Sequence, residues 1–219
     1  MRAARATSPD RGPIRGRVRI LGPTALWLFC VTLGFAALDG HDRTPGATAP
    51  APGRWPADCG LAPRTAGLPT LVLFAHPLCP CTRATVGELE VLMAREAGRV
   101  DARVVFVRPP GVEPRWERTA LWDRVARIPG VVVSADEGGV EASRFGAKTS
   151  GQVLLYDPDG VLRFSGGITA SRGHAGDNAG RAAVEGLLSG RTDVPASTPV
   201  YGCPLLAPPC DPKGATCVR

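Results

Sequence analysis

The amino-acid sequence predicts an α/β fold in which a central mixed β-sheet is flanked by helices, preceded by one transmembrane helix. Short apolar runs suited to buried strands alternate with segments whose apolar residues recur at helical spacing. Late in the chain, the turn signal Asp157-Pro-Asp-Gly160 separates two such runs. Near the start, residues 20–38 carry no charge. Strands joined by helices, then a hairpin and a closing helix, give a mixed sheet of this kind.

The first half of the folded part has the order strand, helix, strand, helix. Residues 71–75 are an apolar run fit for a buried strand, and from Pro80 the apolar residues follow a helical period. A second apolar run at residues 104–107 ends before two prolines, and helical spacing returns over residues 121–128. This order predicts parallel strands joined by a helix.

The second half adds a small insertion, a hairpin and a last helix. Residues 131–133 form a short predicted strand and residues 139–145 a short helix. The next strand, residues 153–156, is followed after a turn by its predicted hairpin partner, residues 161–164. Apolar residues at helical spacing over residues 180–188 predict the final helix.

The length of 219 residues, 44% of them hydrophobic, indicates one ordinary domain with extensions. We therefore divide the chain into five parts. These are a basic cytoplasmic N-terminus (1–19), a transmembrane helix or signal anchor (20–38), a Pro/Ala/Gly-rich linker (39–67), the α/β domain (68–190) and a Cys/Pro-rich tail (191–219).

The net charge of +6 comes almost entirely from the N-terminus. Six arginines and one aspartate place +5 in residues 1–19, so the rest of the chain is nearly neutral. Nucleic-acid binding usually needs Lys and Arg concentrated on a folded face. No nucleic-acid partner is expected.

The uncharged segment of residues 20–38 has nineteen residues, enough to cross a hydrocarbon core as a helix. Because the arginine cluster precedes it, we expect a single-pass anchor in the cytoplasmic membrane, with the N-terminus inside and the domain on the periplasmic side. A cleaved signal peptide is the alternative, since Gly34, Ala36 and Ala37 are small. The linker after it has no apolar period and is predicted to be a tether.

Six cysteines follow the apolar segment, a high count for a reducing compartment, so an oxidising one is expected. Cys79 and Cys81 lie at the junction between the first predicted strand of the domain and the helix that follows it. A helix N-terminus favours a thiolate over a thiol, and Pro80 suits the first helical position, so Cys79 is predicted to be the N-cap. Residues two apart within a helix do not face each other, so a Cys79–Cys81 disulfide requires one partner outside the regular helix, which a capping Cys79 provides. Even so, we expect this disulfide to be strained and easily reduced.

The stretch from residue 68 to 190 resembles the thioredoxin-like proteins, in particular their membrane-anchored envelope branch related to TlpA and the peroxiredoxins. The resemblance rests on an apolar strand with Phe74, on Cys79, and on the helix containing Glu88-Leu-Glu90. Residues 145–157 look like the family's approach to its cis-proline strand. The resemblance implies a thiol-disulfide oxidoreductase that acts on a protein thiol or disulfide, or on a redox partner. It implies no cofactor beyond the redox-active disulfide.

The sequence departs from this family at three places. Counted from Glu88, the family's second cysteine falls on Thr82, so the resolving thiol has moved to Cys81. The cis-proline position falls on Gly151, after Ser150, and we expect this peptide bond to be trans. The peroxiredoxin pattern of Thr and Pro before the cysteine is absent. Ordinary peroxiredoxin activity is not expected.

Three further side chains are candidates for supporting roles. His76 with Cys79 and Cys81 offers a soft three-ligand site for Cu(I) or Zn(II), although it also suits a polar strand end. Arg83 either supports the thiolate or is solvated. His174 either carries protons near Cys79 or lies on the surface of a loop whose neighbours cap the last helix.

The remaining cysteines are expected to be structural disulfides, because a Pro-rich tail has little apolar surface to hold it. They are Cys59, Cys203, Cys210 and Cys217. In the alternative, a tail cysteine passes electrons to Cys79. The primary functional hypothesis is an oxidoreductase in which Cys79 attacks and Cys81 resolves. Cu(I) delivery and a non-enzymatic binding module are the two alternatives.

Overall fold

The computed structural model of the protein describes residues 14–61 and 65–206. The chain forms two compact units, Met1–His41 and Asp42–Arg219. Helix α1, Ile14–Asp42, makes up the first. Its stretch Leu21–Asp42 has a mean hydropathy of 1.8 and is long and apolar enough to cross a membrane. A signal sequence near an N-terminus has the same properties. Large apolar side chains of this stretch are exposed, Trp27 and Phe29 among them.

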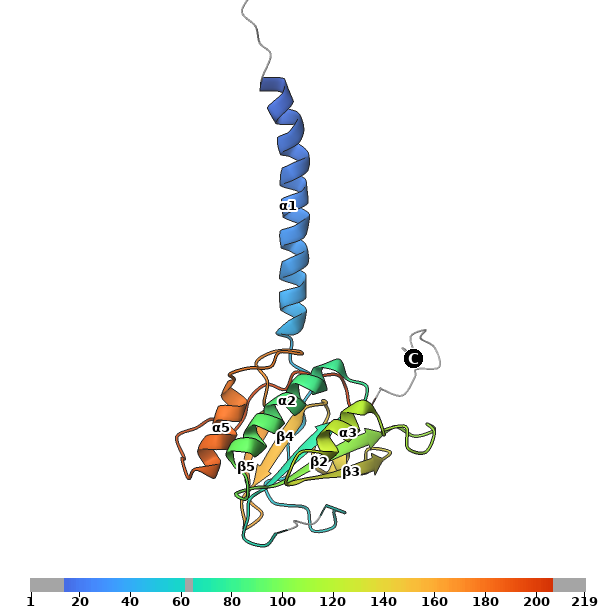
Figure 1. The fold of residues 1–219 in the computed structure, drawn as a ribbon, viewed down its shortest axis with the longest axis vertical. Coiled ribbons are helices and arrows are strands. Elements are labelled where there is room, and N and C mark those ends of the chain that lie inside the picture. The colour runs from blue at the N-terminus through green and yellow to red at the C-terminus, as the bar shows by residue number, and fades with distance from the viewer. Residues whose placement is uncertain (1–13, 62–64, 207–219) are drawn as a thin grey trace, which may run out of the picture. The chain divides into compact units, whose positions relative to one another are not determined.

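The second unit is built on a five-stranded mixed sheet (Figure 1), as predicted. The strand order is β3-β2-β1-β4-β5, with β1, β2 and β3 parallel, and β4 and β5 antiparallel to their neighbours. The strands are β1 (Thr70–Ala75), β2 (Asp101–Arg108), β3 (Val131–Glu137), β4 (Gln152–Tyr156) and β5 (Leu162–Gly167). Every residue of β1 is buried. This central position explains its uninterrupted apolar run.

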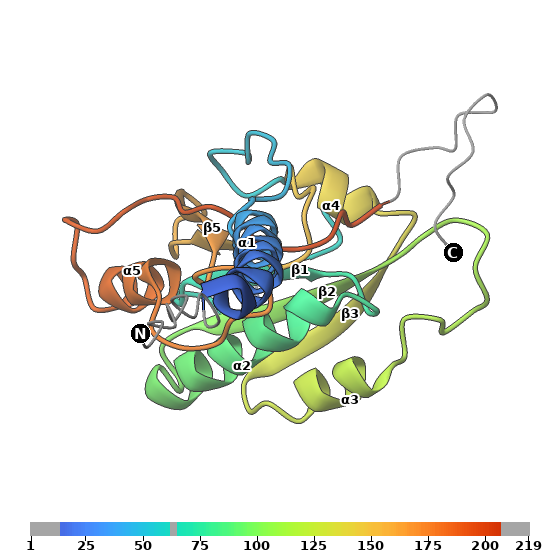
Figure 2. The same ribbon diagram turned by 90° about the horizontal axis from the view of Figure 1, so that it is seen from above.

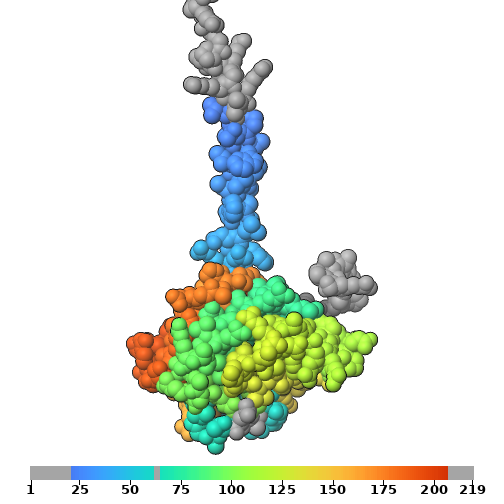
Figure 3. All heavy atoms as spheres, in the orientation of Figure 1, coloured from blue at the N-terminus to red at the C-terminus, as the bar shows by residue number. Residues whose placement is uncertain are grey.

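Helices cover both faces of the sheet. They are α2 (Pro80–Arg95), α3 (Ala120–Ala126), α4 (Val140–Arg144) and α5 (Ala179–Leu188). Apolar residues of α2, α3 and α5 share one core with the sheet, and these helices fill the face seen in Figure 3. Helix α4 contributes to a second core, on the opposite side from α2 and α3 in Figure 2. The predicted helices are present.

The segment predicted to be a tether packs on the domain from Gly46 onward, so that prediction is wrong for this part of the linker. Gly46 N–H donates to the Val200 carbonyl over 2.8 Å, and Leu162 N–H donates to the Gly53 carbonyl over 3.0 Å. Trp55 sets its ring edge-on to Phe145, 5.1 Å between centroids. A Pro- and Gly-rich composition excludes regular helices and strands, but such a chain still covers an exposed edge like that of β5.

The predicted tail also returns to the sheet. Ser165 N–H donates to the Ala196 carbonyl over 3.0 Å, and an isolated antiparallel bridge pairs Thr149 with Pro204. This segment therefore belongs to the same compact unit as the sheet. Cys210 and Cys217 lie outside the described residues.

Candidate functional site

Cys79 caps helix α2 just beyond the end of strand β1, as predicted. Its backbone is extended, with φ −75° and ψ 118°, and Pro80 begins the helix. Cys79 N–H donates to the His76 carbonyl over 3.1 Å, and Thr82 N–H donates to the Cys79 carbonyl over 3.2 Å. The Cys79 side chain is only 3% exposed, whereas Cys81 is half-buried. The turn thus holds Cys79 at the start of the helix, where the helix dipole is positive.

A chain of hydrogen bonds runs from the end of β1 to the Cys79 sulfur. His76 N–H donates to Ser150 Oγ over 2.7 Å, and Ser150 Oγ lies 2.6 Å from Thr82 Oγ1. Thr82 in turn hydrogen-bonds the Cys79 side chain. Each hydroxyl has one proton to donate. If the Ser150 hydroxyl donates to Thr82 Oγ1, the Thr82 hydroxyl can donate its own proton to the Cys79 sulfur. The chain therefore favours a thiolate at Cys79.

The pKa of Cys79 lies below its ordinary value. Burial acts to raise this pKa, but hydrogen bonds from the side chains and backbones of Thr82 and Cys203 outweigh burial and lower it. The partial positive charge at the start of α2 acts in the same direction. These contacts therefore favour the thiolate form of Cys79.

Cys203 lies beside Cys79 and Cys81, although the sequence analysis placed it among the structural disulfides. It reaches them because Ser150 N–H donates to the Cys203 carbonyl over 2.8 Å, which fixes the tail next to the hydrogen-bond chain. Cys59 lies elsewhere, where its thiol donates to the Leu61 carbonyl over 3.5 Å. Both Cys59 and Cys203 are free thiols in the structure. No bridge joins them.

The other two thiols of the site hold their protons more tightly than Cys79. Burial and then the charge of Cys79 raise the pKa of Cys81. Burial, the hydrogen bond to Cys79 and the charges of Cys79 and Cys81 raise the pKa of Cys203 to about 12. Arg172 lowers both pKa values through its positive charge. The three cysteines therefore form one electrostatically coupled cluster with Arg172.

Arg172 was missed as a site residue, although the sequence analysis singled out its loop for His174. Arg172 Nη1 donates to the Gly202 carbonyl over 2.6 Å, next to Cys203. His174 is exposed, and its N–H donates to the Ser171 carbonyl of the same loop over 3.4 Å. Its proposed proton-carrier role stays a prediction. A basic residue within a Gly-rich polar loop was the available signal.

Glu88 of α2 holds this loop against the helix that Cys79 caps. Its buried carboxylate accepts hydrogen bonds from the Gly176 N–H over 2.6 Å and from the Asn178 side-chain amide over 3.1 Å. It also pairs with Arg181 Nε at 2.7 Å, with both side chains less than one-tenth exposed. The acidic residue that contributed to the family resemblance is thus a structural anchor for the loop containing Arg172.

A cavity of about 270 Å³ opens beside Cys79, between the start of α2 and the start of α3. Its wall includes Cys79, Arg83, Thr119 and Leu121. Leu78, which also lines it, is 61% exposed. Arg83 therefore lies at the mouth of the site. The cavity gives a ligand a route to a sulfur that is otherwise buried.

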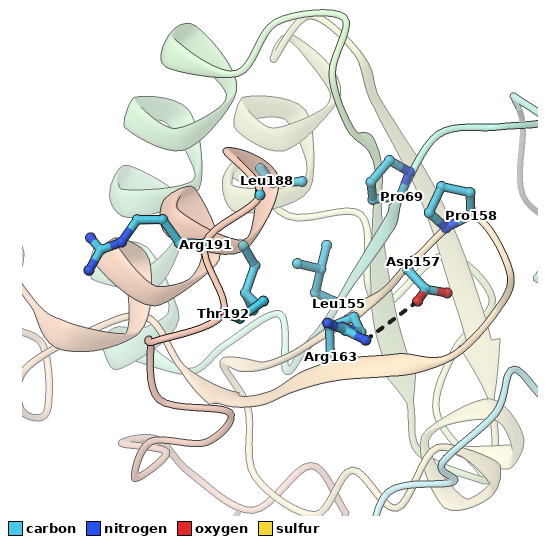
Figure 4. A pocket seen from close by; sticks show the side chains of 10 residues that line it. Pro69, Leu155, Asp157, Pro158, Arg163, Leu188, Arg191 and Thr192 are labelled. Atoms are coloured by element: carbon cyan, nitrogen blue, oxygen red, sulfur yellow. Dashed lines mark ion pairs between the residues drawn. The ribbon is translucent and has the colours of Figure 1, made fainter.

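A second hollow, of about 250 Å³, lies at the opposite end of β1 (Figure 4). It is lined by Pro69, which precedes β1, and by Arg163, whose Nη1 lies 3.9 Å from Asp157 Oδ2. The six residues of β1 span roughly 20 Å, and the cysteines follow the far end of that strand. This hollow is therefore not part of the thiol site.

The candidate metal site receives no support from the arrangement of its residues. His76 Nδ1 accepts a hydrogen bond from Leu78 N–H over 3.2 Å, and its ring stands edge-on to Trp116 at 5.5 Å between centroids. Burial lowers the pKa of His76. Among residues 14–61 and 65–206, no three His, Cys, Asp or Glu side chains are placed to hold a metal ion.

The position that carries a cis-proline in the resembled family is Gly151, and its peptide bond is trans, as expected; no cis bond occurs in the described part of the chain. Gly151 has φ +94° and its N–H donates to the Phe74 carbonyl over 2.8 Å. Its missing side chain leaves room for Thr85, whose Oγ1 would lie 3.0 Å from a Cβ there. Glycine therefore suits both the backbone angle and the close packing against α2.

The mixed sheet, its flanking helices and the cysteine at the start of α2 define a thioredoxin-like fold. Two solved structures share it. One is an uncharacterized conserved protein from Geobacillus kaustophilus, with TM-score 0.56, 20% identity and coverage of 77% of this chain and 95% of that one. The other is a hypothetical protein from Sinorhizobium meliloti, with TM-score 0.52, 22% identity and coverage of 64% and 79%.

A secreted disulfide oxidoreductase from Mycobacterium tuberculosis also aligns, with 16% identity over 57% of this chain and 83% of that one. Its TM-score of 0.40 is too low to carry an argument. No family model and no curated protein matches the sequence. The comparisons therefore establish the fold, and the chemistry rests on the site itself.

Proposed function

We propose that this protein is a thiol-disulfide oxidoreductase whose nucleophile is Cys79. The observation that carries the proposal is a buried thiol with a lowered pKa at the wall of an open cavity, with a second thiol, Cys81, two residues on and close enough for the charge of Cys79 to raise its pKa. Thiolate character and access to a partner together determine the rate of thiol-disulfide exchange.

The reaction follows the ordinary course of thiol-disulfide exchange. The Cys79 thiolate attacks one sulfur of a substrate disulfide, the substrate S–S bond breaks, and the released substrate thiolate takes up a proton. Cys81 then loses its proton and attacks the Cys79 sulfur, which releases the second substrate thiol. The protein ends with a Cys79–Cys81 disulfide, and two electrons have passed to the substrate. The reverse sequence oxidises a dithiol.

The proposed partner is a protein disulfide or dithiol that enters the cavity beside Cys79. Leu78 offers an exposed apolar contact at the rim, and Arg83 and Arg124 place guanidinium groups in the wall. Arg124 already pairs with Glu90, at 2.7 Å, so Arg83 is the more available of the two for an acidic or polar group on a substrate. A flexible peptide segment that carries the reactive cysteine fits a cavity of this size better than a folded surface does.

We further propose that α1 anchors the protein in the cytoplasmic membrane, with the thiol domain on the periplasmic side. The support is the apolar stretch of α1 and the cluster of arginines that precedes it in the sequence. The six cysteines after that stretch agree with an oxidising compartment.

Reduction of insulin by the full chain in detergent micelles, with dithiothreitol as the electron source, tests the proposed activity. The wild type and Cys59→Ser are expected to accelerate the reaction equally, since Cys59 lies away from the cluster. Cys79→Ser is expected to fall to the uncatalysed rate. If Cys79→Ser and the wild type have the same activity, the proposal is wrong and a binding module becomes the better account.

A further inference from the structure

Cys203 is held at the thiol pair by backbone contacts on both sides of it. Its own carbonyl accepts from Ser150 N–H over 2.8 Å, and two residues later Leu205 N–H donates to the Lys148 carbonyl over 2.9 Å. On the other side, Gly202 packs so closely that a side chain there would collide with the Ser150 carbonyl. This segment of the tail has one fixed place, next to residues that contact Thr82.

The Cys79 sulfur is therefore within reach of thiols from two separate elements. Cys81 follows it on α2, and Cys203 approaches from the tail, close enough for its side chain and backbone to lower the pKa of Cys79. Cys203 is half-buried, so its thiol is neither exposed to every oxidant nor enclosed in apolar packing.

The two possible disulfides of Cys79 differ in geometry. A Cys79–Cys81 bond joins the N-cap of α2 to its second residue, a short closed loop that the sequence predicts to be strained. A Cys79–Cys203 bond would join two elements far apart in the sequence and already in contact in the fold. In the chain-entropy account such a long closed loop stabilises the native state more.

The charges of the cluster set the order of events. After burial, the hydrogen bond to Cys79 and the charge of Cys79 are the causes that raise the pKa of Cys203. Once the Cys79 sulfur is part of a mixed disulfide it carries no charge, so both of these causes disappear. The positive charge of Arg172, which lowers the same pKa, remains. Cys203 therefore ionises more readily after Cys79 has reacted than before.

We propose that Cys203 is a resolving thiol of this site, in addition to Cys81. When Cys79 carries a mixed disulfide with a substrate, the Cys203 thiolate attacks the Cys79 sulfur. The bond between Cys79 and the substrate breaks, and the substrate leaves as a thiolate that takes up a proton. A Cys79–Cys203 disulfide forms, and the two electrons of this pair have gone to the substrate disulfide. The inference rests on the proposed function, because it requires attack by Cys79.

Oxidised glutathione as substrate, with mass-spectrometric mapping after acid quenching, tests this in the full chain in detergent. We compare Cys81→Ser, Cys203→Ser, the double variant that combines them, and Cys59→Ser in the Cys81→Ser background as the matched control. We expect Cys81→Ser, with or without the control substitution, to form a Cys79–Cys203 bridge and to lose the mixed disulfide of Cys79 with glutathione. The double variant is expected to accumulate that mixed disulfide.

Two results overturn the assignment of Cys203 while leaving the proposed function standing. One is that Cys81→Ser accumulates glutathione on Cys79 to the same extent as the double variant. The other is that Cys79 closes onto Cys210 or Cys217 rather than onto Cys203. If Cys79 takes up no glutathione in the double variant, attack by Cys79 fails and the proposed function falls with it.

Discussion

Replacement of Thr82 by valine removes the hydroxyl that ends the hydrogen-bond chain at Cys79, with little change in side-chain volume. Thr82 is fully buried and Cys79 nearly so, so water does not replace the lost hydrogen bond. A hydrogen bond to a charged group contributes about 1.5 to 3 kcal/mol. The lower figure changes the thiolate-to-thiol ratio about tenfold and raises the ionisation midpoint of Cys79 by about one pH unit.

The expected change in reactivity at pH 7 is smaller than this change in ionisation. Intrinsic nucleophilicity rises with thiol pKa with a Brønsted slope of about 0.4 to 0.5, so the alkylation rate falls only about threefold to fourfold. The sign follows from the lowered pKa of Cys79 in the wild type, which keeps the thiolate populated at lower pH than an ordinary thiol. Because Thr82→Val removes one of the hydrogen bonds that lower the pKa of Cys79, the pH profile of the alkylation rate moves to higher pH.

Iodoacetamide alkylation of Cys79, followed by peptide mass spectrometry across a pH series, measures both quantities without interference from the other cysteines. Thr85→Val is the matched control, because it removes another buried threonine hydroxyl of α2. We expect its profile to match the wild type. If Thr82→Val leaves the midpoint unchanged, or lowers it, the argument from the hydrogen-bond chain is refuted.

Three further substitutions test neighbouring parts of the account. Ser150→Ala should move the Cys79 alkylation profile in the same direction as Thr82→Val but less far, and an unchanged profile would show that Ser150 does not orient Thr82. Arg172→Met should raise the pKa of Cys81, so that Cys81 needs a higher pH to release glutathione from its mixed disulfide with Cys79. Stopped-flow detection of the released thiol measures this pH dependence, and a shift to lower pH would contradict the prediction. Glu88→Ala leaves the buried Arg181 with weaker partners and should reduce the free energy of unfolding, measured by urea titration, by about 3 kcal/mol. A loss below about 1 kcal/mol would mean that this ion pair does not anchor the loop.

The fold followed from the sequence because its strands and helices have strong periods. The apolar run before His76 lies in the middle of the sheet with both faces buried, and the switch of period at Pro80 marks the start of α2. The same local pattern placed Cys79 at the helix cap. Features that depend on neighbours in sequence were therefore predictable.

Features that depend on contacts between distant segments were not. Nothing local to Cys203 indicates that its carbonyl meets Ser150, because that contact exists only once the tail lies beside the residues that precede β4. Arg172 likewise reaches the thiols through contacts between distant segments, because Glu88 holds its loop against α2 and its own guanidinium donates to the Gly202 carbonyl. The packing of the linker from Gly46 onward could not be predicted for the same reason. An extended segment without an apolar period does not indicate which residues it will hydrogen-bond.

A redox titration of Cys79 tests the central claim most directly. The full chain is equilibrated in a series of thiol-disulfide buffers, quenched in acid, and the oxidised fraction of Cys79 is read by peptide mass spectrometry. The account predicts a reversible two-electron transition of Cys79 that changes tenfold in ratio for about every 30 mV, with its partner in Cys81 or Cys203. A Cys79 that stays reduced across the whole series, or that oxidises no more readily than Cys59, would contradict it.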